Sequence, residues 1–271
     1  MTSKKRSLAV PILEIHNPAP DTWRMKLYEP EIATNALAGN FVNVAVDNAP
    51  NLLWRRPLGI HQTDPKNGTF EILFKAVGRG TGALAQLTTD DQLDIIGPLG
   101  NTFTHPPGLE EAIMVAGGLG IALFPLLLQN LAEKNIKRTL FFGVKTAGEF
   151  CCLNALMQHD TELVLSTEDG SRGHTGYITD SLEEYLNSLT SMENKQLYVC
   201  GPTPMMQAVQ KMALHHNIQG QVSLENIMAC GFGACMGCPV PLAVPKPDGT
   251  TYLLACKDGP VFNMKDIIIN D

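Results

Sequence analysis

The stretch "ACGFGACMGCPV", residues 229–240, places three cysteines and three glycines within twelve residues. A fourth cysteine, Cys256, follows in "LLACKDGPVF" at residues 253–262, so that the complete spacing is C-x4-C-x2-C-x17-C. Thiols at this density can form a disulfide staple, bind zinc or hold an iron–sulfur cluster. The choice among these three sites decides how the rest of the chain is interpreted.

The overall composition argues against a disulfide staple. The chain has 271 residues, seven cysteines and a net charge of −7. Its basic start is interrupted by Pro11 and Glu14 before a signal peptide could form, and the longest apolar run, residues 112–128, is too short to span a membrane. We therefore expect a cytoplasmic protein, in which disulfides are rare. The negative charge also gives no reason to expect nucleic acid or an acidic membrane as a partner.

The asymmetry of the spacing favours iron–sulfur over zinc. Structural zinc sites usually present two C-x2-C pairs, whereas here three cysteines share one loop and the fourth stands alone. That arrangement matches the plant-type pattern of a [2Fe–2S] cluster. Gly231, Gly233 and Gly237 would let the loop wrap closely and aim amide N–H groups at the cluster sulfurs. The pattern therefore favours a [2Fe–2S] cluster, with zinc as the alternative, held by Cys230, Cys235, Cys238 and Cys256.

The chain before these cysteines shows two different patterns. Short apolar strands follow one another, without helical periodicity until about residue 84, and predict a small antiparallel β-barrel. Further along, apolar runs alternate with helical or loop segments, as in a parallel α/β sheet. We expect a multidomain α+β protein with a barrel at 1–108, an α/β domain at 109–219 and a small cluster domain at 220–271. The segment 106–108, Pro-Pro-Gly, is a plausible linker.

Two motifs of the predicted barrel are candidate phosphate sites. In "WRRPLGI", residues 54–60, a basic residue before proline can set a guanidinium against a diphosphate, although an exposed edge strand is the simpler reading of this motif alone. In "KAVGRGTGAL", residues 75–84, three glycines open the first helical segment that we expect in the chain. Such a segment can bind phosphate through its N–H groups or can be a flexible turn.

A third motif marks the predicted α/β domain. In "VAGGLGIA", residues 115–122, a strand runs into glycines before a helix, which is a credible place for a nucleotide pyrophosphate. The G-x-G-x-x-G fingerprint is not complete, because Leu123 stands where the third glycine would be. Each motif is weak by itself, and their order along the chain carries the interpretation.

In that order the chain resembles the ferredoxin–NADP reductase superfamily, and more closely the electron-transfer subunits of class 1B dihydroorotate dehydrogenase. The segments that carry the resemblance are "RRPLGI", "GPLGN", "CGPTPM", "SLENIMACGFGACMGC" and "CKDGPVF". The resemblance implies a flavoprotein oxidoreductase in which NADH gives a hydride to FAD and the flavin passes electrons singly to the cluster. It also implies an FMN-containing catalytic subunit of pyrimidine biosynthesis as partner, in a heterotetramer with two copies of each chain.

The resemblance also assigns individual residues. The FAD-binding positions would be Arg56, Pro57, Leu58, Gly59, Leu73, Phe74, Lys75, Gly80, Thr81 and Gly82. The NAD-binding positions would be Gly117, Gly118, Gly120, Gly201 and Pro202, with Cys200 next to the nicotinamide. The four cysteines of the C-terminal region would be the cluster ligands. This sequence departs from the family pattern at Gly59, where Ser or Thr is usual, and at Leu123, where proline is usual.

Alternatives remain at this point. Similar subunits serve other NAD(P)H-linked ferredoxin or sulfide-reducing complexes, and the choice between NAD and NADP is open, since Lys145 could meet a 2′-phosphate. A more distant alternative is a zinc-stabilised interaction module. Cys151 and Cys152 show no ligand pattern and are interpreted as packing residues.

Overall fold

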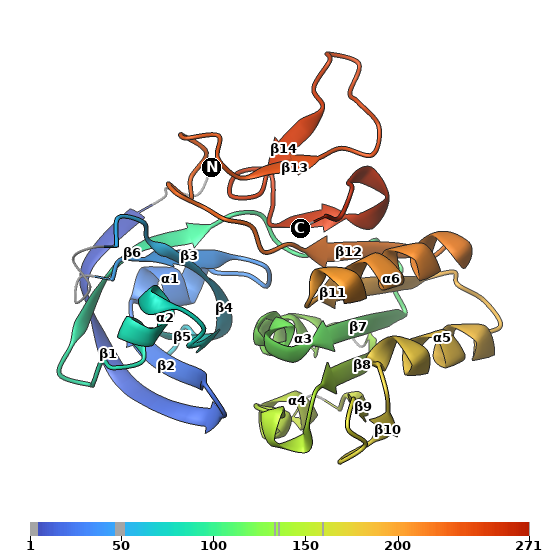
Figure 1. Ribbon diagram of the computed structural model, residues 1–271, viewed down its shortest axis with the longest axis horizontal. Coiled ribbons are helices and arrows are strands. Elements are labelled where there is room, and N and C mark those ends of the chain that lie inside the picture. Colours follow the sequence, from blue (N-terminus) through green and yellow to red (C-terminus); the bar gives the residue numbers. More distant parts are fainter. Residues whose placement is uncertain (1–4, 47–51, 133, 135, 159, 271) are drawn as a thin grey trace.

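The computed structural model describes residues 5–46, 52–132, 134, 136–158 and 160–270. A closed β-barrel and a seven-stranded sheet lie side by side, and the C-terminal segment with its two-stranded hairpin crosses over both of them (Figure 1). The predicted combination of an antiparallel barrel, a parallel α/β sheet and a small cysteine-rich region is confirmed.

The barrel is closed in the strand order β1-β2-β5-β4-β3-β6, and every strand pairs antiparallel with its neighbours. Alternate side chains point inward, so that Ile60, Ile72 and Ile95 are completely buried. The strands are β1 (Lys5–Ala19), β2 (Thr22–Tyr28), β3 (Phe41–Val44), β4 (Arg56–Asp64), β5 (Thr69–Lys75) and β6 (Gln92–Leu99).

The first helix precedes the segment in which the sequence predicted it. Helix α1 (Pro30–Asn35) comes between β2 and β3, and α2 (Arg79–Leu84) is the second helix. Pro30 stands at the first helical position, and the carboxylate of Glu29 accepts a hydrogen bond from the N–H of Glu31 at 3.3 Å. Six residues are too few for helical periodicity to show in the sequence, so the expectation that residues 75–84 contain the first helix of the chain was wrong.

The second body is a mostly parallel sheet in the order β10-β9-β8-β7-β11-β12-β15. Only its last strand, β15, runs antiparallel to its neighbour. The central strand β7 is buried on both faces, as parallel strands between helices are. The strands are β7 (Glu111–Gly117), β8 (Lys137–Val144), β9 (Glu162–Thr167), β10 (His174–Thr175), β11 (Lys195–Cys200), β12 (Gln219–Ser223) and β15 (Val261–Asn263).

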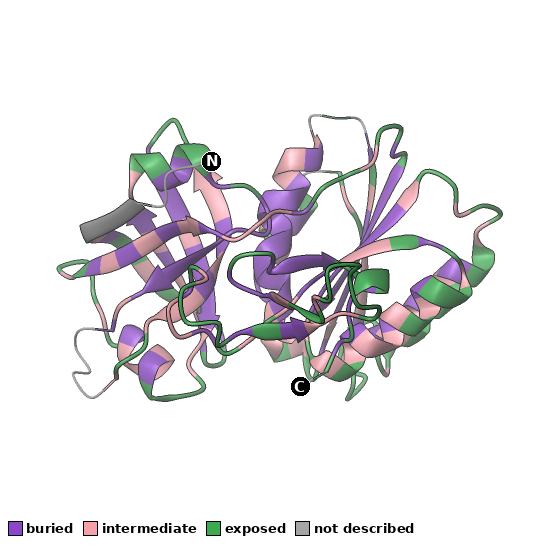
Figure 2. Cartoon of the chain, turned by 90° about the horizontal axis from the view of Figure 1, so that it is seen from above, coloured by how far each residue is buried: buried purple, intermediate pink, exposed green. Residues whose placement is uncertain are grey.

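Helices cover both faces of this sheet (Figure 1). Strand β7 sends Met114 toward the barrel and α3, and Ile113 and Val115 toward α5 and α6. Buried residues are therefore concentrated in the strands, with exposed residues on the outer helical faces (Figure 2). The helices are η1 (Gly118–Leu123, a 3₁₀ helix), α3 (Phe124–Ala132), η2 (Ala147–Glu149, 3₁₀), α4 (Leu153–Met157), α5 (Ile178–Ser188) and α6 (Thr203–His215). In the part of the chain that the structure describes, no helix is both long and apolar enough to cross a bilayer.

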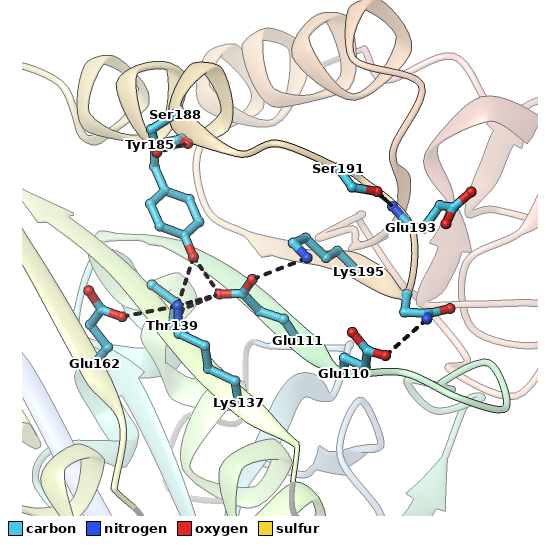
Figure 3. A network of polar contacts seen from close by, with 11 residues as sticks. Glu110, Glu111, Lys137, Thr139, Glu162, Tyr185, Ser188, Ser191, Glu193 and Lys195 are labelled. Atoms are coloured by element: carbon cyan, nitrogen blue, oxygen red, sulfur yellow. Dashed lines mark hydrogen bonds and ion pairs between the residues drawn. The ribbon is translucent and has the colours of Figure 1, made fainter.

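A network of polar side chains surrounds the first residue of the central strand β7 (Figure 3). The carboxylate of Glu111 is buried and accepts hydrogen bonds from the hydroxyls of Thr139, at 2.9 Å, and of Tyr185. Lys137 lies 3.0 Å from the same carboxylate, and Lys195 lies 3.9 Å from its other oxygen. Burial alone would raise the pKa of Glu111, but the hydrogen bonds from Tyr185, Lys137 and Thr139 lower it.

The C-terminal region leaves the sheet and returns to it. After β12 the chain forms the cysteine loop and the hairpin of β13 (Pro239–Pro241) and β14 (Tyr252–Leu254). It then re-enters the sheet as β15, beside β12, and ends near η3 (Met264–Asp266). The predicted boundary at residue 219 falls at the first residue of β12, so strands on both sides of that boundary belong to one sheet.

Candidate functional site

A cavity of about 480 Å³ opens where the barrel, the sheet and the segment after β12 meet. Its first wall comes from the barrel: Pro57, Leu58 and Gly59 of β4 and Leu73, Phe74 and Lys75 of β5 lie along it, together with Thr81 of α2. Phe41 of β3, which pairs with Gly59 in the ladder, also lines the cavity. The structure thus brings most of the predicted FAD-binding residues to one surface.

The remaining predicted FAD residues lie beside this wall rather than in it. Gly80 lies directly against the side chain of Arg56, since a Cβ on Gly80 would be 2.2 Å from the Arg56 Nε. The guanidinium donates to the carbonyl of Trp54 at 2.5 Å. Helix α2 also contains Gly82, whose N–H bonds to the Gly78 carbonyl. With glycine at position 80 the Arg56 side chain packs directly on α2, so the arginine and the α2 turn form one continuous surface next to the cavity.

The second wall joins the glycine turn to the end of β11. Strands β7 and β11 are neighbours, and Gly117, Gly118 and Gly120 follow the carboxyl end of one while Gly201 and Pro202 follow the other. A Cβ on Gly120 would lie 2.1 Å from the carbonyl oxygen of Cys200, which only glycine avoids. Carboxyl ends of parallel strands are where nucleotides bind in such sheets. All the predicted NAD-binding residues therefore share this wall.

The third wall contains residues to which the sequence analysis gave no role. Ser223, the last residue of β12, and Glu225 and Asn226, which follow it, also line the cavity. They belong to "SLENIMAC", a segment that carried the family resemblance, and this was the only signal that could have found them. Burial raises the pKa of the Glu225 carboxyl. Burial and the nearby Glu225 carboxylate raise the pKa of the Cys200 thiol, so Cys200 stays neutral at pH 7.

The two departures from the family pattern meet in this cavity. A Cβ on Gly59 would lie 2.4 Å from the Cδ2 atom of Leu123. Both residues line the cavity, one from the barrel and the other from η1. The Leu123 side chain therefore occupies the space that a larger residue at position 59 would need.

The cysteine loop is shaped to receive anionic sulfur. The N–H groups of Ala234 and Cys235 donate to the Cys230 sulfur at 3.3 and 3.5 Å. Burial alone would raise the pKa of this thiol, but the backbone donors lower it to about 6. On the inner side, the sulfur of Cys238 lies 3.3 Å from that of Cys256 and accepts from the Cys256 N–H at 3.4 Å.

These observations fit the groups that the sequence predicts. The four cysteines are a suitable donor set for an iron–sulfur cluster, and backbone N–H groups donate to two of their sulfurs, those of Cys230 and Cys238. In the described part of the chain, no three or more His, Cys, Asp or Glu side chains are grouped closely enough to hold a metal ion. Gly231 and Gly233 adopt positive φ values of 77° and 88°, as the predicted wrapping of the loop requires. The cavity offers apolar barrel surface for a flavin ring and a glycine turn for a nucleotide. Cys151 lies in the core away from this loop, as a packing residue.

Three family models match the chain in sequence order. They are an oxidoreductase FAD-binding domain over residues 13–104, an oxidoreductase NAD-binding domain over residues 114–211, and the iron–sulfur cluster binding domain of dihydroorotate dehydrogenase B over residues 225–268. The predictions of FAD, NAD and iron–sulfur binding regions are thereby confirmed, and the zinc-stabilised module is not supported.

Relatives match over nearly the whole length. The chain is 34% identical to the electron transfer subunit of dihydroorotate dehydrogenase B (NAD(+)) from Desulforamulus reducens, over 93% of this chain and 94% of that protein. The same subunit from Clostridium acetobutylicum is 38% identical over 80% of each chain. Among solved structures, an NADH-dependent reduced ferredoxin–NADP oxidoreductase, studied for flavin-based electron bifurcation, superposes with a TM-score of 0.83 at 25% identity, over 99% of this chain and 92% of that one.

Proposed function

The chain belongs to the family of electron-transfer subunits of dihydroorotate dehydrogenase B, and we propose that it carries electrons between NAD(H), FAD and a [2Fe–2S] cluster for a separate catalytic subunit. One observation carries this proposal. The predicted flavin strands, the glycine turn and the end of β11 line a single cavity, and the cysteine-bearing segment adjoins it. We retain the division into domains at 1–108, 109–219 and 220–271 as part of the proposal.

The barrel wall would hold the FAD. Bound FAD supplies the conversion between two-electron and one-electron steps, and the chain's own residues orient it. Pro57, Leu58 and Gly59, with the β5 residues, would contact the flavin ring, while Arg56 and Gly80 to Gly82 would hold the diphosphate. The apolar faces of this wall would exclude water from the ring.

The opposite wall would hold the nicotinamide nucleotide. The turn of Gly117, Gly118 and Gly120 would receive its pyrophosphate, and Cys200, Gly201 and Pro202 would place the nicotinamide against the flavin. Cys200 would act there as a neutral thiol, because its raised pKa disfavours the thiolate. Glu225, whose pKa is also raised, is suited to hold or release a proton at its carboxyl group near this point. We propose NAD rather than NADP, in line with the names of the relatives.

The cluster would face the partner. Cys230, Cys235, Cys238 and Cys256 would be its ligands, and the exposed apolar side chains of Ile227, Phe232 and Met236 surround the first three. Exposed apolar residues around a redox group suit a docking surface for a protein partner. We propose an FMN-containing dihydroorotate dehydrogenase subunit as this partner, in a heterotetramer with two copies of each chain. The cytoplasmic location stays a prediction from the sequence.

A second candidate is a subunit of a ferredoxin–NADP oxidoreductase. It is favoured by the superposition over 99% of the chain with the NADH-dependent enzyme described above. The two candidates share the cavity and the cysteine loop and differ only in the partner that exchanges electrons with the cluster.

The test is reconstitution with each partner. The chain would be purified anaerobically and mixed either with the FMN-bearing subunit from its own host or with ferredoxin. We expect dihydroorotate-dependent NAD reduction only when both subunits are present, and none from this chain alone. NADH-driven ferredoxin reduction without any dihydroorotate activity would replace the first candidate by the second. A colourless, zinc-loaded protein without flavin would contradict both.

A further inference from the structure

Two motifs of the sequence meet at a joint that has no place in the proposal above. "GPLGN", residues 97–101, ends β6 of the barrel, and "DGPVF", residues 258–262, follows the fourth cysteine. The backbone N–H of Asn101 donates to the Gly259 carbonyl at 2.7 Å. A Cβ on Gly100 would lie 2.5 Å from the Pro260 ring, so the two segments are in direct contact.

The side chain of Asn101 makes three hydrogen bonds across this contact. Its amide donates to the carbonyls of Asp258 at 2.9 Å and Val261 at 2.7 Å, and its oxygen accepts from the Val261 N–H at 2.9 Å. The amide of Asn40 holds the turn at residues 99–101, because it donates to the carbonyls of these three residues at 3.2–3.3 Å. A carboxamide is the one side-chain group that can both donate and accept in this way.

Asn101 forms its hydrogen bonds with the segment that follows Cys256. The chain turns tightly there, because the N–H groups of Lys257, Asp258 and Gly259 all bond to the Leu254 carbonyl. The carboxylate of Asp258 accepts from the Leu254 N–H at 2.8 Å and closes the turn. Holding Asp258 and Val261 therefore holds the position of Cys256.

A second asparagine, in the barrel, forms a hydrogen bond with the segment that carries Cys230. Asn43 of β3 is completely buried, and its amide donates to the carbonyl of Cys230 at 3.0 Å. Gly231 packs so closely on it that a Cβ there would lie 2.3 Å from the Asn43 Nδ2. In the barrel ladder Asn43 pairs with Pro57, which lines the cavity wall proposed for FAD. Asn43 thus connects the flavin wall to the first cysteine through one residue pair and one hydrogen bond.

We propose that Asn43 and Asn101 are positioning residues that fix the location of the cluster relative to the flavin barrel. This inference rests on the proposed function. Each asparagine fixes one of the two segments that carry cluster ligands, the loop of Cys230 and the turn of Cys256. Asn43 lies in β3 and Asn101 directly follows β6, so both anchors reach the cysteine-bearing segments from the barrel side. The sheet holds the same region through β12, before the first cysteine, and through β15 and Gln210 of α6 at residues 261–267, beyond the fourth.

The test compares Asn43→Ala, Asn101→Ala and the double variant with the unchanged full chain, all loaded with FAD and cluster. Loss of one net hydrogen bond favours local opening by about tenfold. We therefore expect amide hydrogen exchange around residues 228–238 to accelerate about tenfold in the Asn43 variant, and around 254–261 at least as much in the Asn101 variant. In rapid mixing with NADH, flavin bleaching should keep its rate while cluster bleaching slows several-fold, most strongly in the double variant.

Gln210→Ala is the matched control, since Gln210 donates to the Met264 and Ile267 carbonyls at 2.5 and 3.0 Å without reaching a cysteine segment. It should loosen residues 264–268 and leave cluster bleaching unchanged. Asn43→Leu guards against misfolding, because it keeps nearly the same shape and removes the donor without placing a charge in this buried site. Cluster bleaching at the unchanged rate in all asparagine variants would overturn the inference. A failure of NADH to bleach the cluster in the unchanged chain would instead contradict the proposed function, while the exchange data would still decide whether the asparagines anchor the loops.

Discussion

Gly59 and Leu123 are best understood as one structural unit. The Leu123 side chain lies where the Cβ of a residue at position 59 would be, at a separation of only 2.4 Å. Leu123 is 7% exposed, but it borders the cavity. A side chain at 59 would therefore need Leu123 to leave its present conformation, so the two departures from the family pattern are structurally coupled.

This contact predicts a specific coupling between two substitutions. Gly59→Ser should destabilise the chain by about 1–3 kcal/mol, because it overpacks the contact. Leu123→Ala should cost about 2–5 kcal/mol by leaving a cavity. In the double variant the serine fills part of that cavity, so the loss should fall below the sum of the two by at least about 1 kcal/mol. Denaturant unfolding of the four proteins measures this, with FAD content as a second readout. Strictly additive losses would show that the two side chains do not compete for space.

Residues whose chemistry is local could be predicted from the sequence, whereas residues whose partners are distant in the chain could not. The cysteine spacing and the glycine turns lie within short segments, so their pattern shows in the sequence. Asn43 and Asn101 have no such pattern, because their partners lie 187 and 157–160 residues further along the chain. An asparagine in a strand and one in a turn look ordinary until the fold brings Cys230 and Asp258 to them. Glu225 and Asn101 were visible only inside quoted motifs, without a role.

At the scale of elements, the parallel sheet is locked by the buried Glu111 network at the start of β7 (Figure 3). Tyr185 reaches it from α5, Lys137 and Thr139 from β8, and Lys195 from β11. The Glu111 carboxylate therefore connects β7, β8, β11 and α5 at the amino ends of the strands, whereas the cavity lies at their carboxyl ends. None of these residues lines the cavity, so we assign the network to stability.

Glu111→Gln should destabilise the chain by about 2 kcal/mol at pH 7, because two lysines lose a charged partner. The pKa of Glu111 is lowered in the folded state, so the carboxylate contributes its full stability above the unfolded pKa of about 4.3 and loses it as pH falls through the lower folded value. The difference between the two proteins should therefore shrink in acid. Urea unfolding at several pH values between about 3 and 7 checks this.

Glu162→Gln is the control for that comparison. Glu162 pairs with the same Lys137 at 3.3 Å, but its side chain is 55% exposed, and an exposed pair contributes little. We expect a change below about 0.5 kcal/mol that hardly varies with pH. An equal loss in both variants would contradict the view that burial gives Glu111 its importance.

Long elements were predictable and short or returning ones were not. Strand β7 and the glycine turn were found because seven buried residues lead directly into glycines. Helix α1 has six residues, and β15 has three and joins the sheet from the far side of the cysteine loop. Its place beside β12 depends on where the cysteine-bearing segment folds, which no local pattern encodes.

At the scale of the whole molecule, the cavity exists because three parts of the chain meet. The barrel, the glycine turn and the segment after β12 contribute one wall each. The barrel and the sheet have extensive apolar cores, whereas residues 229–237 of the cysteine loop are mostly exposed or half-buried and have no regular secondary structure. A loop with so little core of its own depends on its metal group for order.

Cluster removal should therefore act locally. Cys235→Ser replaces an exposed cysteine of the proposed ligand set, so it should abolish stable cluster binding without opening a cavity in the core. We expect the variant to lose its iron, to keep FAD in about equimolar amount, and to become cleavable by protease within residues 229–237. The barrel and the sheet should unfold at nearly the same denaturant concentration as before, because their cores do not contain this loop.

Iron analysis, flavin absorbance and limited proteolysis measure the effects on cluster, flavin and loop. Loss of FAD together with iron would mean that the cluster loop and the flavin wall form one cooperative unit. The matched substitution Cys151→Ser, at a buried cysteine away from the loop, should leave the iron content unchanged.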